Sequence, residues 1–140
     1  MEFICKQSEL EIPVKFIRER IEQKHIAFPV LLLSGEMGSG KTTFTSTFVK
    51  SYNPGVWVNS PSFNLMNEYD LQNGLSIYHF DLYRLHFADE LEDLGFEEYW
   101  GKRGISIVEW WEIAKDYFLE EVIQLEFSVV DEFTRKIVVK

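Results

Sequence analysis

The chain contains one cysteine, Cys5, among its 140 residues, so it cannot form an internal disulfide bond. Long apolar runs are also missing, since no stretch approaches the roughly 20 residues that a helix needs to cross a bilayer. Residues 1–13 lack the basic start and apolar core of a secretion signal. Together with the phosphate-binding motif described below, these absences predict a cytoplasmic protein with no membrane association.

Basic residues are scarce relative to acidic ones. The 14 lysines and arginines stand against 23 aspartates and glutamates, which gives a formal net charge of −9. Such a charge repels a phosphate backbone and gains nothing from counterion release. We therefore expect no DNA binding, and contact with RNA only indirectly, through protein partners, unless the fold gathers basic residues into one local patch.

Segments that divide a chain into domains are absent as well. No low-complexity tract, internal repeat or flexible linker interrupts the sequence, and its four prolines are scattered. An apolar content of 46% and an aromatic content of 16% are ample for a packed core. We expect residues 1–140 to form one domain.

The most informative feature that is present is a phosphate-binding motif. Residues 35–42, GEMGSGKT, fit the pattern G-x-x-x-x-G-K-[ST], between a predicted buried strand at 28–33 and a predicted helix at 41–52. A loop that wraps a polyphosphate must present successive backbone N–H groups, and glycines allow the tight turn and close approach. Lys41 would extend over the β- and γ-phosphates, and Thr42 would offer its hydroxyl to Mg²⁺. The motif therefore predicts binding of a nucleoside triphosphate.

A second segment could contact the nucleotide. Two hydroxyls of Ser60-Pro61-Ser62-Phe63 follow a predicted strand, so the segment is either a nucleotide-sensing switch loop or a plain Ser-Pro turn. The predicted nucleotide-binding residues are Gly35, Glu36, Met37, Gly38, Ser39, Gly40, Lys41, Thr42, Thr43 and Ser62.

Two carboxylates are candidates to serve the nucleotide. A P-loop needs an acid at the end of a neighbouring strand, because Mg²⁺ and the attacking water must be held in place. Glu109 ends the apolar run 105–108, and Asp81 ends the run 78–80 in the same manner. The alternative for each is an acid at the end of a strand in solvent.

The remaining pattern predicts an α/β fold. Strands are expected at 2–6, as an edge strand, and at 28–33, 56–58, 63–70, 75–82, 104–108, 122–130 and 135–140. The pair around 72–74 and the last pair are expected to be hairpins, which brings antiparallel pairing into the sheet. Helices are expected at 13–24, at 41–52, at 88–100 with an interruption at Gly95, and at 111–119. The fold class is a P-loop NTPase-like three-layer sandwich with a mixed parallel and antiparallel central sheet.

Five segments, in this order and at this spacing, resemble the bacterial TsaE (YjeE) family. They are Gly35 to Phe44 (GEMGSGKTTF), Ser60 to Phe63 (SPSF), His79 to Leu85 (HFDLYRL), Glu90 to Tyr99 (ELEDLGFEEY) and Ile107 to Trp110 (IVEW). The first is generic to P-loops, whereas HFDLYRL followed by a Glu-Trp pair is specific to that family. The resemblance implies a small ATPase of tRNA threonylcarbamoyladenosine (t6A) biosynthesis.

The resemblance also implies roles for residues and partners. Lys41 and Thr42 would hold the phosphates and Mg²⁺, Glu109 would be the Walker-B-like acid and a second metal ligand, and Asp81 would be an essential carboxylate near the γ-phosphate. Trp110 matches the tryptophan that the family has beside this acid. ATP hydrolysis would act on a TsaD-TsaB type complex that modifies tRNA, and would reset that complex between turnovers.

Other functions remain open from the residues alone. A small-molecule kinase would share the loop and the acid, but such enzymes clamp their substrates with several arginines, and only Arg84 and Arg103 lie between the hairpin and Glu109. A non-catalytic nucleotide-binding module is a further alternative, whereas a GTPase is disfavoured because no Asn-Lys-x-Asp stretch is present. The three histidines show no metal-ligand spacing with cysteine. With no arginine evidently placed as a finger, we expect slow hydrolysis that a partner accelerates.

Overall fold

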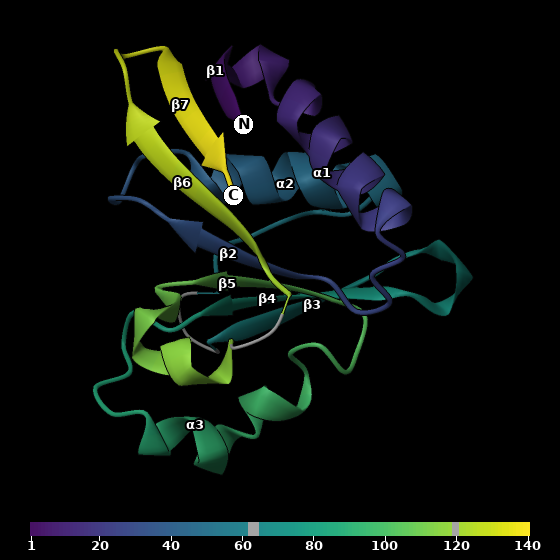
Figure 1. The fold of residues 1–140 in the computed structure, drawn as a ribbon, viewed down its shortest axis with the longest axis vertical. Helices are drawn as coiled ribbons and strands as arrows, with labels where there is room; N and C mark the ends of the chain where they lie inside the picture. Colours follow the sequence, from purple (N-terminus) through teal and green to yellow (C-terminus); the bar gives the residue numbers. More distant parts are fainter. Residues whose placement is uncertain (62–64, 119–120) are drawn as a thin grey trace.

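The structure is a computed structural model that describes residues 1–61, 65–118 and 121–140. Within these residues, seven strands form one mixed sheet at the centre of the molecule, in the order β1-β7-β6-β2-β5-β4-β3 (Figure 1). The strands are β1 (Glu2–Lys6), β2 (Val30–Ser34), β3 (Met66–Asp70), β4 (Ser76–Asp81), β5 (Ile105–Glu109), β6 (Ile123–Val129) and β7 (Thr134–Val139).

The centre of the sheet is parallel and both of its edges are antiparallel. β2 runs parallel to β5 and β6, and β4 runs parallel to β5. β7 pairs antiparallel with β1 and β6, and β3 pairs antiparallel with β4. The carboxyl ends of parallel strands meet at one edge of a sheet, which is where ligands bind in open α/β folds. The residues that end β2, β4 and β5 therefore come together.

Helices cover both faces of this sheet (Figure 1). One face carries α1 (Glu11–Gln23) and α2 (Lys41–Tyr52), and the other carries α3 (Asp89–Leu94) with the 3-10 helices η3 (Phe96–Glu98) and η4 (Trp111–Tyr117). The 3-10 turns η1 (Gln7–Glu9) and η2 (Gln72–Gly74) lie in connections. The predicted three-layer α/β sandwich with a mixed sheet is confirmed.

β2 shows why both layers are needed. Leu31 and Leu33 belong to the apolar cluster beneath α1 and α2, whereas Val30 and Leu32 belong to the cluster on the opposite face. Side chains alternate across a strand, so a strand covered on both faces is apolar at every position.

The two long helices follow from local sequence. In α1, Val14 and Ile17 are buried and Ile21 is partly buried, which is the spacing of one apolar helix face. α2 spans Lys41–Tyr52 as predicted, and α1 begins at Glu11, slightly before the predicted start. A turn follows α2, in which the backbone N–H of Gly55 donates to the Asn53 side chain at 3.3 Å.

Most of the remaining predicted elements are confirmed. β1 is an edge strand, β3–β4 and β6–β7 are hairpins, and the acidic segment forms two short helical pieces separated at Gly95, whose φ is +71°. The helix predicted at 111–119 is the 3-10 helix η4, which ends at Tyr117. Its predicted last residue lies outside the described residues, as does the first part of the strand predicted at 63–70.

The strand predicted at 56–58 is wrong. Val56 and Val58 are partly buried against the apolar cluster while Trp57 is exposed, so the alternation that suggested a strand is real. The segment is nevertheless tied to the sheet edge by side chains: the Tyr69 hydroxyl bonds both the N–H and the carbonyl of Asn59, at 3.2 and 2.8 Å. These bonds take the place of a backbone ladder.

No helix among the described residues is both long and apolar enough to span a membrane.

Candidate nucleotide site

The phosphate-binding motif forms a tight loop between the end of β2 and the start of α2. A Cβ atom on Gly35 would lie 2.6 Å from the Ser39 hydroxyl and 2.8 Å from the Phe127 carbonyl oxygen, closer than side chains tolerate. Gly40 precedes the first residue of α2 with a φ of +103°, a conformation that favours glycine. Both glycines are thus required by the geometry of the loop, as the motif predicts.

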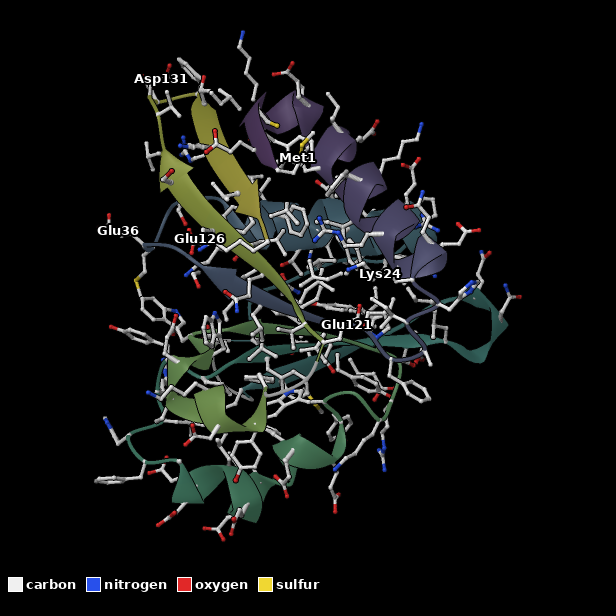
Figure 2. The ribbon with its side chains drawn as sticks, in the orientation of Figure 1. Met1, Lys24, Glu36, Glu121, Glu126 and Asp131 are labelled. Carbon is white, nitrogen blue, oxygen red and sulfur yellow. The ribbon has the colours of Figure 1, made fainter. Side chains whose placement is uncertain are left out.

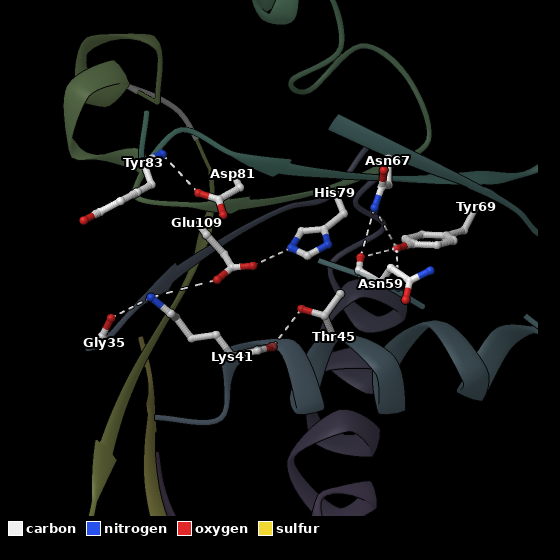
Figure 3. Close-up of polar contacts among 10 residues, drawn as sticks. All are labelled: Gly35, Lys41, Thr45, Asn59, Asn67, Tyr69, His79, Asp81, Tyr83 and Glu109. Atoms are coloured by element: carbon white, nitrogen blue, oxygen red, sulfur yellow. Dashed lines mark hydrogen bonds and ion pairs between the residues drawn. The ribbon is translucent and has the colours of Figure 1, made fainter. Parts of the chain in front are cut away.

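Lys41 is buried inside this loop. Its Nζ donates to the Gly35 carbonyl at 2.6 Å and lies 3.9 Å from Oε1 of Glu109 (Figure 3). The same ammonium group sits 4.4 Å from the centroid of the Trp110 ring, in cation–π geometry. A buried cation needs such partners because its desolvation is costly. Three separate groups therefore fix the lysine at the mouth of the loop.

The two predicted carboxylates lie side by side at the ends of neighbouring strands. Asp81 on β4 is the register partner of Glu109 on β5 (Figure 3). Glu109 is buried, and its Oε2 lies 2.5 Å from Nε2 of His79. Asp81 is half-buried and accepts a hydrogen bond from the backbone N–H of Tyr83 at 3.0 Å. The sheet thus places both acids next to Lys41.

The environment of Asp81 raises its pKa. Loss of hydration is the largest cause, and the nearby charge of Glu109 acts in the same direction. The hydrogen bond from Tyr83 and the charges of His79 and Lys41 oppose this rise in pKa without cancelling it.

A cavity of about 470 Å³ opens over these groups. It brings together most of the predicted site residues with others outside that set, of which Tyr83 and Arg135 were not singled out in the sequence. Its lining consists of Met37, Gly38, Gly40, Lys41, Thr42, Thr43, Ser60, Asp81, Tyr83, Arg84, Glu109, Trp110 and Arg135.

Some predicted residues stand outside this cavity. Gly35 does not line the cavity, but its carbonyl accepts a hydrogen bond from Lys41, which does. Ser39 is buried in the loop and lines an adjoining cavity. Glu36 is exposed and its side chain points away from the molecule at the tip of the loop (Figure 2). Ser62 lies outside the described residues, although Ser60 of the same segment lines the cavity.

Arginine is the residue type that the sequence reasoning missed. Arg84 and Arg135 both line the cavity, and Arg135 donates to the carbonyl of Gly38 in the loop at 3.3 Å. Arg84 follows Asp81 closely in the chain, so its position could have been inferred. Arg135 comes from the last strand, and no local pattern links it to the loop.

Two consecutive tryptophans follow Glu109, and only the first of them lines the cavity. Trp110 has a φ of +55°, and its ring lies 5.0 Å from that of Tyr83 as well as next to Lys41. Trp111 points to the other side, where its Nε1–H donates to the Ser34 hydroxyl at 2.9 Å. The two tryptophans therefore differ in their contacts. Trp110 faces the cavity, and Trp111 links η4 to the end of β2.

An adjoining cavity of about 560 Å³ lies on the other side of the loop. Ser39, Gly40, Thr43 and Arg135 line it at the loop, and Gly40, Thr43 and Arg135 also line the first cavity. The rest of its lining mixes apolar residues, such as Leu10, Phe127 and Ile137, with polar and charged ones, such as Lys6, Asp131 and Glu132. The two cavities therefore share their wall at the loop.

The loop and the sheet around it define the class of protein: the chain has a P-loop α/β fold, and this fold family indicates nucleotide binding. The family model "Threonylcarbamoyl adenosine biosynthesis protein TsaE" matches residues 7–137. The chain belongs to the TsaE family, whose role lies in t6A biosynthesis.

Individual relatives agree with this assignment. Over 108 residues the chain is 38% identical to the tRNA threonylcarbamoyladenosine biosynthesis protein TsaE of Bacillus subtilis, a match covering 77% of this chain and 66% of the relative. The protein of the same name from Rickettsia felis is 38% identical over 76% of this chain and 61% of its own length. Each match thus spans less than two thirds of the relative. The crystal structure of Bacillus subtilis YdiB superposes with a TM-score of 0.68 and 26% identity, over 98% of this chain and 82% of that one.

Proposed function

We propose that the protein binds ATP with Mg²⁺ in the cavity over the loop and hydrolyses it to support repeated t6A modification by a TsaD-TsaB type complex. The observation that carries the proposal is the convergence of Lys41, Asp81 and Glu109 at the ends of three neighbouring elements. The role of the family in t6A biosynthesis implies partner proteins, and a TsaD-TsaB type complex is the partner in this proposal. Residues 1–140 would form one domain, and the protein would act in the cytoplasm.

Each group has a role that its position supports. Lys41, held at 2.6 Å from the Gly35 carbonyl, would turn its charge to the β- and γ-phosphates, and the loop N–H groups would cradle them. Asp81 lies beside Glu109 at the cavity, where it would orient the attacking water. Arg84 and Arg135 would add positive charge to the transferring phosphoryl group, so part of what a partner was expected to supply is within this chain.

The residues present fit a magnesium ion. Thr42 is exposed at the start of α2 and lines the same cavity as Glu109, and we propose that its hydroxyl and one carboxylate oxygen of Glu109 would hold the ion. Among the described residues, no group of three or more histidine, cysteine or acidic side chains forms a metal cage. Mg²⁺ bound to ATP takes most of its ligands from phosphate and water and neutralises phosphate charge.

The adjoining cavity would take the base and ribose of the nucleotide. Ser39, Gly40 and Thr43 connect it to the loop, so a ligand whose phosphates lie on the loop can extend into it. Its apolar residues, among them Phe127 and Leu10, would pack against a flat heterocycle, and its polar residues would face the ribose.

Phosphate release tests the proposal. We expect Lys41→Ala to abolish ATP binding and hydrolysis, and Asp81→Ala or Glu109→Ala to spare binding more than turnover. Lys50→Ala, at the exposed end of the same helix, is the matched control and should behave as the wild type. The measurements are calorimetric MgATP binding and inorganic phosphate released with and without a TsaD-TsaB type complex. Wild-type rates in both carboxylate variants would refute the assignment of the site.

Product identity separates hydrolysis from the kinase alternative. Two arginines in the cavity are also what a kinase uses to clamp an acceptor, so the alternative needs its own test. Phosphate that appears without any added acceptor supports hydrolysis. Turnover that depends on a small-molecule acceptor and yields its phosphorylated form would support a kinase.

A further inference from the structure

His79 is a buried polar residue that the proposed reaction does not yet use. It lies on β4, and its side chain has no solvent exposure. It is one of the few buried polar or charged residues in the described part of the chain, and two others, Lys41 and Glu109, belong to the proposed site. A buried polar ring is tolerated when it is hydrogen-bonded, and the partner of His79 is Glu109 (Figure 3).

We assign the proton of this contact to Nε2 of His79, 2.5 Å from Oε2 of Glu109, because an ionised carboxylate only accepts. The other ring nitrogen, Nδ1, is buried and has no hydrogen-bond partner among the described residues. The imidazole therefore has a defined partner on one side only.

The two oxygens of Glu109 consequently differ. Oε2 is bound by His79, whereas Oε1 lies 3.9 Å from Nζ of Lys41, at the cavity. A glutamate has one more rotatable bond than an aspartate, so a glutamate at the end of a strand needs an anchor to keep one oxygen in a fixed place. His79 comes from the adjacent strand and meets this need.

We propose that His79 is the positioning residue of Glu109: its Nε2–H holds Oε2, so that Oε1 is presented to the phosphate cavity. The inference rests on the proposed ATP hydrolysis, because Glu109 acts there. His79 does not touch the nucleotide, and its effect reaches the reaction through the orientation of one carboxylate. Hydrogen bonds to groups that hold a metal or a reacting water typically change activity about 10- to 100-fold when they are removed.

Three variants separate positioning from packing. His79→Leu fills a similar volume without a donor, whereas His79→Gln places an amide N–H close to the position of Nε2. His86→Gln is the control, since His86 is exposed and does not line the cavity. In the presence of a TsaD-TsaB type complex, we expect His79→Leu to lower kcat about 10- to 100-fold, with KM for ATP changed by less than about twofold. His79→Gln should recover most of the rate.

A second readout does not depend on activity. In the nucleotide-free protein, nitrogen-15 NMR should show the imidazole proton of His79 on Nε2, protected from exchange with water. Glu109→Ala should shift this resonance and speed its exchange, and Glu121→Ala, at an exposed position that does not line the cavity, should not. Thermal unfolding of each variant reports whether it folds.

The outcomes are distinguishable. Phosphate release by His79→Leu at the wild-type rate overturns the inference and leaves the proposed function intact. Equal losses of kcat in the folded Leu and Gln variants, or a neutral ring with its proton on Nδ1 and none on Nε2, also overturn it, because His79 then donates nothing to Glu109. If His79→Leu does not fold, the Gln variant and the NMR measurement decide. A wild-type protein that releases no phosphate even with its partner complex overturns the proposed function, and the inference with it.

Discussion

At the scale of the residue, Asp81 and Glu109 show how the sheet gives two similar acids different surroundings. They are register partners, yet Glu109 is buried with its carboxylate between His79 and Lys41, whereas Asp81 is half-buried with a single backbone hydrogen bond. For Asp81, loss of hydration dominates and raises its pKa. A raised pKa at a carboxylate that lies in a cavity beside a charged partner is typical of functional sites.

The raised pKa of Asp81 predicts a pH dependence of stability. Between the ordinary aspartate pKa of 3.8 and the raised folded value, the folded state binds more protons than the unfolded state. Stability from this group is therefore present at low pH and is lost as pH rises through the folded pKa. Asp81→Asn, whose oxygen still accepts from Tyr83, should be slightly more stable than the wild type at pH 7, and the difference should vanish in acid. Solvent screening at a half-buried site keeps the effect small.

Urea unfolding between pH 3 and 8 measures this difference. Asp93→Asn, at an exposed position on α3, is the matched control and should follow the wild-type curve. If Asp81→Asn is instead less stable than the wild type at pH 7, the charge of Asp81 stabilises the fold, contrary to its desolvated setting.

At the scale of the element, the segment before β3 is held by a tyrosine where a strand was expected. The Tyr69 hydroxyl bridges the N–H and carbonyl of Asn59, and the Asn67 amide donates to the same carbonyl at 3.0 Å (Figure 3). The next residue, Ser60, lines the cavity over the loop. Side chains of β3 therefore help to position one wall of the candidate site.

Removing the tyrosine hydroxyl should loosen that wall. We expect Tyr69→Phe to lower the free energy of unfolding by about 1 to 3 kcal/mol, because both hydrogen bonds to Asn59 are lost. The change should also speed hydrogen exchange at the Asn59 amide. Exchange at the amides of β2, in the centre of the sheet, is the internal reference and should change only as far as global stability does. Unchanged protection of Asn59 would mean that the segment is held by its partly buried valines, Val56 and Val58.

Elements were predictable from the sequence where the local residue pattern also determines which segment they pack against. The P-loop with its flanking strand and helix, and the acids that end β4 and β5, follow from spacing and from the rule that parallel strands share an edge. The alternation at 56–58 was equally clear but did not indicate its pairing partner. Arg135 reaches Gly38 only because β7 folds next to the loop, and His79 gains significance only once β4 lies beside β5. These contacts join residues that lie far apart in the chain, so a local stretch of sequence cannot reveal them.

At the scale of the whole molecule, the site depends on both layers. The loop and α2 belong to one face, whereas Trp110 is packed against the apolar cluster of the opposite face and turns its ring to Lys41. Trp111 fastens that second layer to the end of β2. The cavity is thus assembled from elements that lie on opposite sides of one sheet, and its geometry requires the complete sandwich.

The net charge of −9 predicts that the isolated protein binds RNA weakly. Proteins that bind nucleic acids without sequence preference typically do so with dissociation constants of about 10⁻⁴ to 10⁻⁶ M at physiological salt, through basic surfaces. We expect the isolated protein to bind tRNA more weakly than about 10⁻⁴ M, and to join it only in a TsaD-TsaB type complex. Fluorescence anisotropy of labelled tRNA, titrated with the protein alone and with the complex at two salt concentrations, checks this. Saturable binding by the protein alone that weakens steeply with salt would instead reveal a basic patch strong enough to overcome the overall charge.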